Sequence, residues 1–237
     1  ALMGAWLAKP FAGLMPGRLK SLMKMAPARV EVASHMDRAQ TFPAEGERRM
    51  RVALMTGCAQ QVLRPSINEA TIRLLTRHGC EVVIADGAGC CGALVHHMGR
   101  ESDSHAAAKA NIDAWHALDG ADSLDAIVIN ASGCGTTVKD YGFMLHSDDT
   151  WAEKARWVSE CTKDITEVMA DLGIATSVLN DAPAVVYHSA CSMQHGQQIT
   201  LQPKALLETA GFDVRSPAEG HLCCGSAGTY NIMQPEL

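Results

Sequence analysis

The chain has 237 residues, 47% hydrophobic and 19% charged, which is the composition of a folded globular protein rather than a disordered one. Its formal net charge of −6 excludes the broad basic surface that nucleic-acid-binding proteins use. No apolar run reaches the roughly 18 residues of a membrane-spanning helix, so no transmembrane segment is predicted.

Residues 1–49 are predicted to form a helical connector followed by a linker. The first 30 residues contain basic and large apolar side chains and no acid. They fit a helical segment packed on the main body, or one that binds a membrane surface or a partner. Residues 40–49 include Pro43, Gly46 and several charges, which favours a linker.

Residues 50–150 are predicted to form a first α/β unit. Apolar runs at 51–55, 81–85 and 126–129 read as buried strands, and amphipathic stretches from Ser66 and from about Glu101 to Leu118 read as helices. Strands that alternate with helices indicate right-handed crossovers and a parallel sheet.

A helical bridge is expected over residues 151–182, and a second, truncated unit over residues 183–237. That unit has strand patterns at 184–187 and 212–214 with a helix at 203–210 between them. The predicted fold is therefore α/β, with two tandem Rossmann-like units that have parallel sheets and are related by an internal repeat.

The repeat is clearest in the cysteines. Nine cysteines that include two adjacent pairs suit a disulfide framework poorly, which favours reduced thiols in a cytoplasmic protein. A lone cysteine precedes an adjacent pair by 32 positions twice, and both features recur after 133 residues. The two sets are Cys58 with Cys90–Cys91, and Cys191 with Cys223–Cys224.

Each repeated cysteine follows a predicted strand, at the edge of a parallel sheet where ligands bind. Cys134 follows the third strand, so four thiols are expected to converge: Cys58, Cys90, Cys91 and Cys134. The position equivalent to Cys134 in the second unit lies beyond Leu237. Cys191, Cys223 and Cys224 are thus an incomplete set, and the chain is expected to be a fragment.

Four converging thiolates with small neighbours suit an iron–sulfur cluster, here a 4Fe–4S cluster at one complete and one incomplete site. Zinc is the rival metal, although its usual close Cys-x-x-Cys pairs are absent. Thiol–disulfide exchange by the adjacent Cys90 and Cys91 is a third interpretation. Cys80 and Cys161 do not recur and are assigned to packing.

Residues 87–92 also match the dinucleotide fingerprint G-x-G-x-x-G. The acid that should end a following strand is missing, because Asn111–Asp113 falls inside a predicted helix, so nicotinamide binding is not favoured. Lys139 and Tyr141 follow the Cys134 loop and are expected only to shape its rim.

Five stretches resemble the cysteine-rich, Cys-Cys-Gly domain family: GCAQ at 57–60, AGCCGA at 88–93, NIDAW at 111–115, ASGCG at 131–135 and HLCCGSAGTY at 221–230. That family includes a cysteine-rich component of heterodisulfide reductase and the iron–sulfur subunits of several dehydrogenases, and the sequence is most similar to those of glycolate oxidase. The resemblance implies an electron-transfer subunit of an oxidoreductase complex. It would pass electrons from a partner flavoprotein, which holds FAD and carries the hydride chemistry, towards quinone or another membrane acceptor.

The resemblance also implies a cytoplasmic location, with peripheral attachment to the inner membrane.

The sequence departs from the cysteine patterns of the family in two ways, which limits what the resemblance implies. Family members carry two ferredoxin-type clusters on a C-x-x-C-x-x-C-x-x-x-C-P pattern, which is absent here. Heterodisulfide reductase relatives end their site with Cys-x-x-Cys, whose first position is Ala131 in this chain, so at most four cysteines can form the first site.

Overall fold

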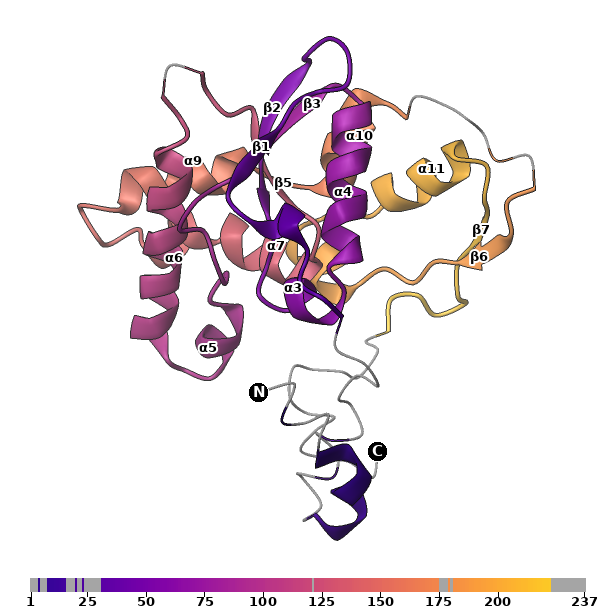
Figure 1. The fold of residues 1–237 in the computed structure, drawn as a ribbon, viewed down its shortest axis with the longest axis horizontal. Coiled ribbons are helices and arrows are strands. Elements are labelled where there is room, and N and C mark those ends of the chain that lie inside the picture. The colour runs from indigo at the N-terminus through magenta and orange to yellow at the C-terminus, as the bar shows by residue number, and fades with distance from the viewer. Residues whose placement is uncertain are drawn as a thin grey trace.

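The computed structural model describes residues 4, 8–15, 20, 23, 31–120, 122–174, 179 and 181–222 (Figure 1). Its main feature is a five-stranded sheet with the order β1–β3–β2–β4–β5. The first strand is antiparallel to its neighbour and the other four are parallel. The strands are β1 (Gln40–Phe42), β2 (Met50–Met55), β3 (Cys80–Ile84), β4 (Ala126–Ile129) and β5 (Thr162–Asp164).

Helices cover both faces of this sheet, which confirms the predicted α/β class with a mostly parallel sheet. In β2, Val52 and Leu54 pack with α4 and α10, whereas Ala53 and Met55 pack with α6, α8 and α9. This alternation is the period of two that a strand imposes on its side chains. The helices of this layered unit are α4 (Ser66–Arg77), α6 (Glu101–His116), α7 (Ser132–Lys139), α8 (Tyr141–Met144), α9 (Ala152–Cys161) and α10 (Ile165–Leu172).

A second, two-stranded sheet pairs β6 (Ala184–Val186) in parallel with β7 (Asp213–Arg215). Two helical segments connect these strands, the π-helical turn η3 (Ser192–Gly196) and α11 (Gln202–Thr209). Both units thus contain parallel strands joined through a helix. The internal repeat that relates them stays a prediction, because residues 223–237 lie outside the described residues.

Two short strands lie where the sequence predicts none. Gln40–Phe42, expected in a linker, is β1 and pairs with β3. Thr162–Asp164, expected in a helical bridge, is β5 and extends the sheet beside β4. Each has three residues, too few to show an alternating pattern in the sequence. Short 3₁₀ segments at Lys9–Leu14 (η1) and His35–Asp37 (η2) precede the sheet.

Asp164 ends β5 and begins α10 through a capping box. Its side chain accepts a hydrogen bond from the Thr166 amide at 2.9 Å, and the Glu167 side chain accepts one from the Asp164 amide at 2.8 Å. The two bonds satisfy amide groups that a helix start leaves unpaired. The cap explains why the helical pattern breaks and restarts at this residue.

None of the helices in the described part of the chain combines the length and the apolar character needed to cross a membrane.

Removing the cap is expected to destabilise the fold. Asp164→Ala should lower the free energy of unfolding by about 1 kcal/mol, because the Thr166 amide loses its acceptor. Asp164→Asn keeps an acceptor oxygen and should lose less. Denaturant unfolding measures both. Asp171→Ala, which removes an exposed ion pair of the same helix with Lys163, is the control and should stay within about 0.5 kcal/mol of the unmodified chain. An equal loss in Asp164→Ala and Asp171→Ala would contradict the role of the cap.

Candidate functional site

Three loops meet at the carboxyl edge of the large sheet. Strand β2 lies between β3 and β4, so the chain leaves β2 towards one side and later returns on the other. Loops at such a switch point enclose the usual ligand crevice of an open α/β sheet. The loop after β2 carries Cys58, the loop after β3 carries Cys90 and Cys91, and the first turn of α7 after β4 carries Cys134.

The structure brings these four thiols together in the order Cys58–Cys90–Cys91–Cys134. The sulfurs of Cys58 and Cys90 are 3.6 Å apart. The Cys91 thiol interacts with the Cys90 thiol on one side and with the Cys134 thiol on the other. Cys58 also lies within electrostatic range of Cys91 and Cys134. The predicted convergence is therefore present, while the role of the four residues as ligands stays a prediction.

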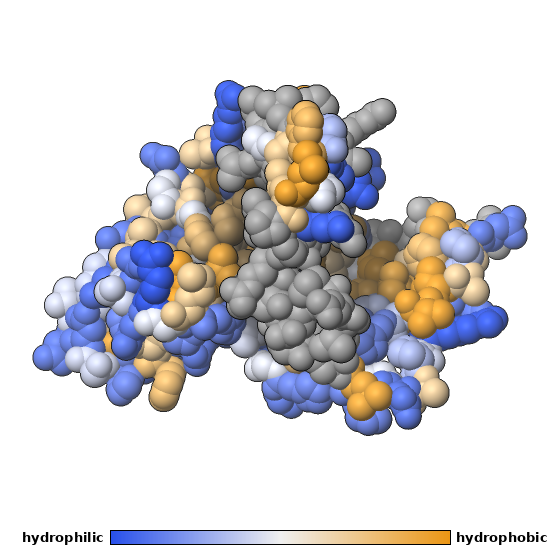
Figure 2. All heavy atoms as spheres, turned by 90° about the horizontal axis from the view of Figure 1, so that it is seen from below, coloured by the Kyte–Doolittle hydropathy of each residue, from blue (hydrophilic) through white to orange (hydrophobic). Residues whose placement is uncertain are grey.

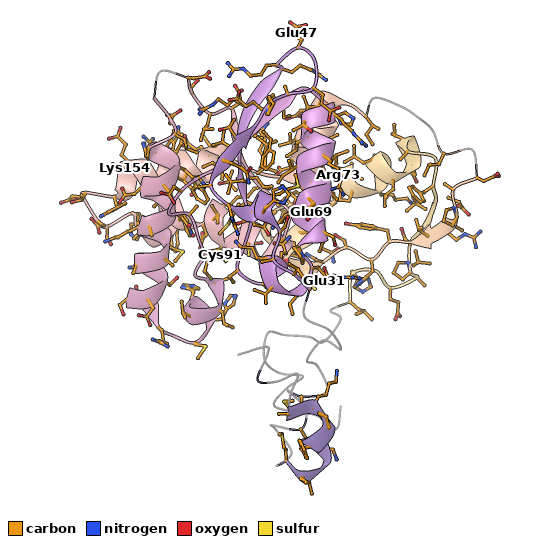
Figure 3. All side chains as sticks on the ribbon, viewed as in Figure 1. Glu31, Glu47, Glu69, Arg73, Cys91 and Lys154 are labelled. Atoms are coloured by element: carbon orange, nitrogen blue, oxygen red, sulfur yellow. The ribbon has the colours of Figure 1, made fainter. Side chains whose placement is uncertain are left out.

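Exposure divides the four thiols into an outer and an inner pair. Cys58 and Cys90 are exposed, whereas Cys134 is half-buried and Cys91 is only 3% exposed. Figure 3 shows Cys91 at the lower end of the central sheet. The molecule is viewed from this side in Figure 2, where hydrophilic and hydrophobic side chains are interspersed. A group bound by all four sulfurs would thus be open to contact on one side only.

The pKa values of the two inner thiols are shifted in opposite directions. The hydrogen bond between Cys91 and Cys134, together with burial, raises the pKa of Cys91 far above that of an ordinary thiol. The same bond lowers the pKa of Cys134, although burial opposes it. Burial, followed by the contact with Cys90, raises the pKa of Cys58. Cys134 is accordingly the thiol of the inner pair that is more readily charged.

Backbone amides at the start of α5 (Ala93–His97) face the sulfurs of the adjacent pair. The Gly92 amide donates to Cys90 Sγ at 3.4 Å, and the Ala93 amide donates to Cys91. Gly92 has a φ of +82°, and a Cβ there would lie 3.1 Å from the Ser104 carbonyl oxygen. Only glycine combines a positive φ with space for the nearby Ser104 carbonyl, which explains the third residue of the Cys-Cys-Gly triplet.

A buried polar network supports the loops after β2 and β4. The Asn68 amide donates to the Thr56 carbonyl at 2.8 Å, and Asn130 donates to Asn68 Oδ1 at 3.0 Å. The Gln60 amide donates to Asn130 Oδ1 at 2.7 Å. These bonds connect residues adjacent to Cys58 with the end of β4. They fix the distance between two of the cysteine loops.

The second cysteine set is described only in part. Cys191 immediately precedes η3, which packs against α7: Ser192 Oγ and Ser132 Oγ are 2.9 Å apart, and Thr136 donates to the Ser192 carbonyl at 3.1 Å. The Cys191 turn therefore adjoins the helix that carries Cys134. Cys223 and Cys224 lie outside the described residues, so their convergence with Cys191 remains a prediction.

The donor set fits an iron–sulfur cluster better than a single ion. Over the described ranges, no three His, Cys, Asp or Glu side chains are grouped closely enough to hold one metal ion. Zinc needs its four sulfurs about 2.3 Å from a common point. The four thiols lie next to small residues and backbone amide donors, as an iron–sulfur cluster requires.

The two remaining cysteines of the first unit lie apart from the site. Cys80 is fully buried in β3, where burial raises its pKa to about 11, and Cys161 packs at the end of α9. The prediction that Tyr141 only shapes the rim of the site is wrong, because Tyr141 is fully buried behind the cysteine pair. Lys139 pairs with Glu167 at 2.5 Å.

Sequence reasoning gave Asn111 no role in the site. Its amide nitrogen donates to the Cys90 carbonyl at 2.9 Å, and most of the buried positions on its helix are apolar. One asparagine among the buried positions Ala108, Ile112 and Trp115 was the signal that could have revealed it.

The inner pair yields a pH-dependent prediction for the metal-free chain. Cys91→Ala removes the hydrogen bond that lowers the pKa of Cys134, so the pH midpoint of Cys134 alkylation should rise. At pH values below this midpoint, alkylation of Cys134 should slow roughly tenfold, because a hydrogen bond to a charged group is lost. Mass spectrometry of alkylated peptides over a pH series measures this. Cys161→Ala is the control, and an unshifted Cys134 profile in Cys91→Ala would contradict the bond.

Two glycines with similar backbones test the tight turn. Gly92→Ala and Gly99→Ala both place a side chain at positive φ, +82° and +73° respectively, but only Gly92 has neighbours within 4 Å. Gly92→Ala should therefore cost at least about 1 kcal/mol more in thermal or denaturant unfolding. Equal losses in the two variants would show that the contact with Ser104 is relieved without cost.

Comparison with known proteins gives one family match. The model of a family described as "Cysteine-rich domain" matches residues 52–139 and 185–237. The glycolate oxidase iron–sulfur subunit of Escherichia coli K12 is 40% identical over 187 residues, covering 79% of this chain and 46% of the relative. A probable glycolate oxidase iron–sulfur subunit of Bacillus subtilis is 31% identical over 227 residues, covering 94% and 50%.

Lactate utilization protein A of Bacillus licheniformis is 27% identical over 190 residues, covering 79% of this chain and 77% of the relative. The chain spans about half the length of the glycolate oxidase relatives it matches.

Proposed function

Because the chain belongs to the cysteine-rich domain family, we propose that it is an iron–sulfur electron-transfer subunit of a glycolate oxidase complex. The observation that carries the proposal is the convergence of Cys58, Cys90, Cys91 and Cys134 at one sheet edge. These four residues would hold one 4Fe–4S cluster. When bound, the cluster supplies one-electron transfer.

The division of work within the complex follows from this assignment. A partner flavoprotein would oxidise glycolate to glyoxylate at FAD and release two electrons, which this chain would pass one at a time towards quinone or another membrane acceptor. The exposed pair, Cys58 and Cys90, marks the side where electrons would enter or leave. The buried pair would shield the other side of the cluster from water.

The remaining cysteines of the repeat would serve a second site. Cys191 adjoins α7, which carries Cys134, so a group held by Cys191, Cys223 and Cys224 would lie beside the first.

Thiol–disulfide exchange is less well supported. It requires an attacking thiolate, and the raised pKa and burial of Cys91 make one half of the adjacent pair a poor nucleophile. The zinc alternative is less well supported because the close Cys-x-x-Cys pairs that zinc sites use are absent from the sequence.

Chemical analysis of anaerobically purified protein tests the proposal. Iron and acid-labile sulfide should each be present at about four per complete site, with broad visible absorption. Serine at Cys58, Cys90, Cys91 or Cys134 should remove most of the iron, because an alcohol replaces a thiolate ligand. Cys161→Ser is the matched control and should retain it. Zinc without sulfide, or a metal-free protein with titratable thiols, would overturn the proposal.

A further inference from the structure

We propose that Asn111 and Tyr141 are positioning residues that fix the backbone of the Cys90–Cys91 pair and so direct its two thiols to different neighbours. The inference rests on the proposed function, in which these cysteines are cluster ligands. It assigns a task to two side chains that hold no ligand themselves.

Asn111 binds the loop on both sides of a peptide unit. It lies on the inner face of α6 and is fully buried. Its Oδ1 accepts a hydrogen bond from the Gly89 amide at 2.7 Å, and its Nδ2 donates to the Cys90 carbonyl at 2.9 Å. One rigid side-chain amide thus holds the residue before the pair and the first cysteine together.

Tyr141 holds the second cysteine. It is the first residue of α8 and is also fully buried. Its hydroxyl donates to the Cys91 carbonyl at 2.9 Å and accepts a hydrogen bond from Asn111 Nδ2 at 3.1 Å. The carbonyls of Cys90 and Cys91 therefore both point towards a buried polar pair, and the two anchoring side chains brace each other.

The anchoring has a consequence for the thiols. Neighbouring residues of an extended chain project to opposite faces, so two adjacent cysteines serve one site only if the backbone between them is held in a specific turn. Here Cys90 reaches outward to Cys58, and Cys91 reaches inward to Cys134. Both loop carbonyls are fixed on the inner side by these hydrogen bonds, so the backbone of the pair maintains this division.

A contribution to fold stability alone does not explain why buried polar side chains occupy positions 111 and 141. Most other buried positions of α6, such as Ala108, Ile112 and Trp115, are apolar and belong to the core beside the sheet. The bonds of Asn111 and Tyr141 run to the cysteine loop or to each other. A fully satisfied buried network of this kind specifies one geometry, which a purely apolar filling would not.

Tyr141→Phe tests the inference in the metal-free chain, since it removes one hydroxyl and little else. Thr162→Val is the matched control: Thr162 is equally buried, its hydroxyl donates to the Val158 carbonyl at 2.6 Å, and it lies in β5 away from the pair. Cysteine alkylation is followed by mass spectrometry for each thiol. The ratio of Cys91 to Cys80 labelling within one chain cancels the contribution of global unfolding, because Cys80 is fully buried in β3.

In Tyr141→Phe, this ratio should rise about fivefold, the factor that one lost buried hydrogen bond gives. In Asn111→Asp, which loses both donor bonds, it should rise by more. Thr162→Val should stay within about twofold of the unmodified chain. An equal ratio in Tyr141→Phe and Thr162→Val would overturn the inference, even if Asn111→Asp fails to fold.

A second readout uses the metal-loaded protein. Tyr141→Phe should alter the electron paramagnetic resonance spectrum of the reduced cluster and speed iron loss to a chelator several-fold, with Thr162→Val unchanged. An unaltered spectrum and rate would also overturn the inference. If the unmodified chain binds no iron or sulfide, the proposed function fails instead, and the labelling ratio alone decides on the positioning role.

Discussion

Parallel pairing of β2 with both β3 and β4 determines where each thiol of the first set lies. Met55 stands opposite Ile129, and Ala53 stands opposite Val83, so the three strands end at one edge. The loops that follow need only a few residues to bring their cysteines together. A slip of one residue in this register would turn the core side chains of a strand to the wrong face, so the same packing that stabilises the sheet also fixes the site.

Two buried hydrogen-bond networks hold the cysteine loops that follow the strands. One, built on Asn68 and Asn130, joins the loops after β2 and β4, and the other, built on Asn111 and Tyr141, holds the loop after β3. Apolar contacts tolerate small shifts, whereas buried hydrogen bonds are costly to break. The site therefore rests on a hydrophobic sheet for its location and on amide and hydroxyl groups for its shape.

The sequence was sufficient to predict the parallel sheet and the gathering of the first four thiols, because both follow from strand ends and a repeated spacing. It was insufficient for β1 and β5, whose three residues show no period, and for Tyr141, whose burial depends on how α8 packs behind the loop. The contacts of Asn111 could not be predicted either, since its partners are backbone groups about 20 residues away in the chain. The relation between the two units depends on residues that include Cys223 and Cys224, and it stays a prediction.

The difference in exposure between the outer and inner thiols also determines which of them oxygen oxidises first. Cys58 and Cys90 are exposed with sulfurs 3.6 Å apart, so in the metal-free chain oxygen reaches these two thiols first. Cys91 is sheltered and keeps its proton, which slows its oxidation. Oxidation would thus begin at the exposed face of the site, and a thiol reductant would reach an oxidised sulfur there from the same side.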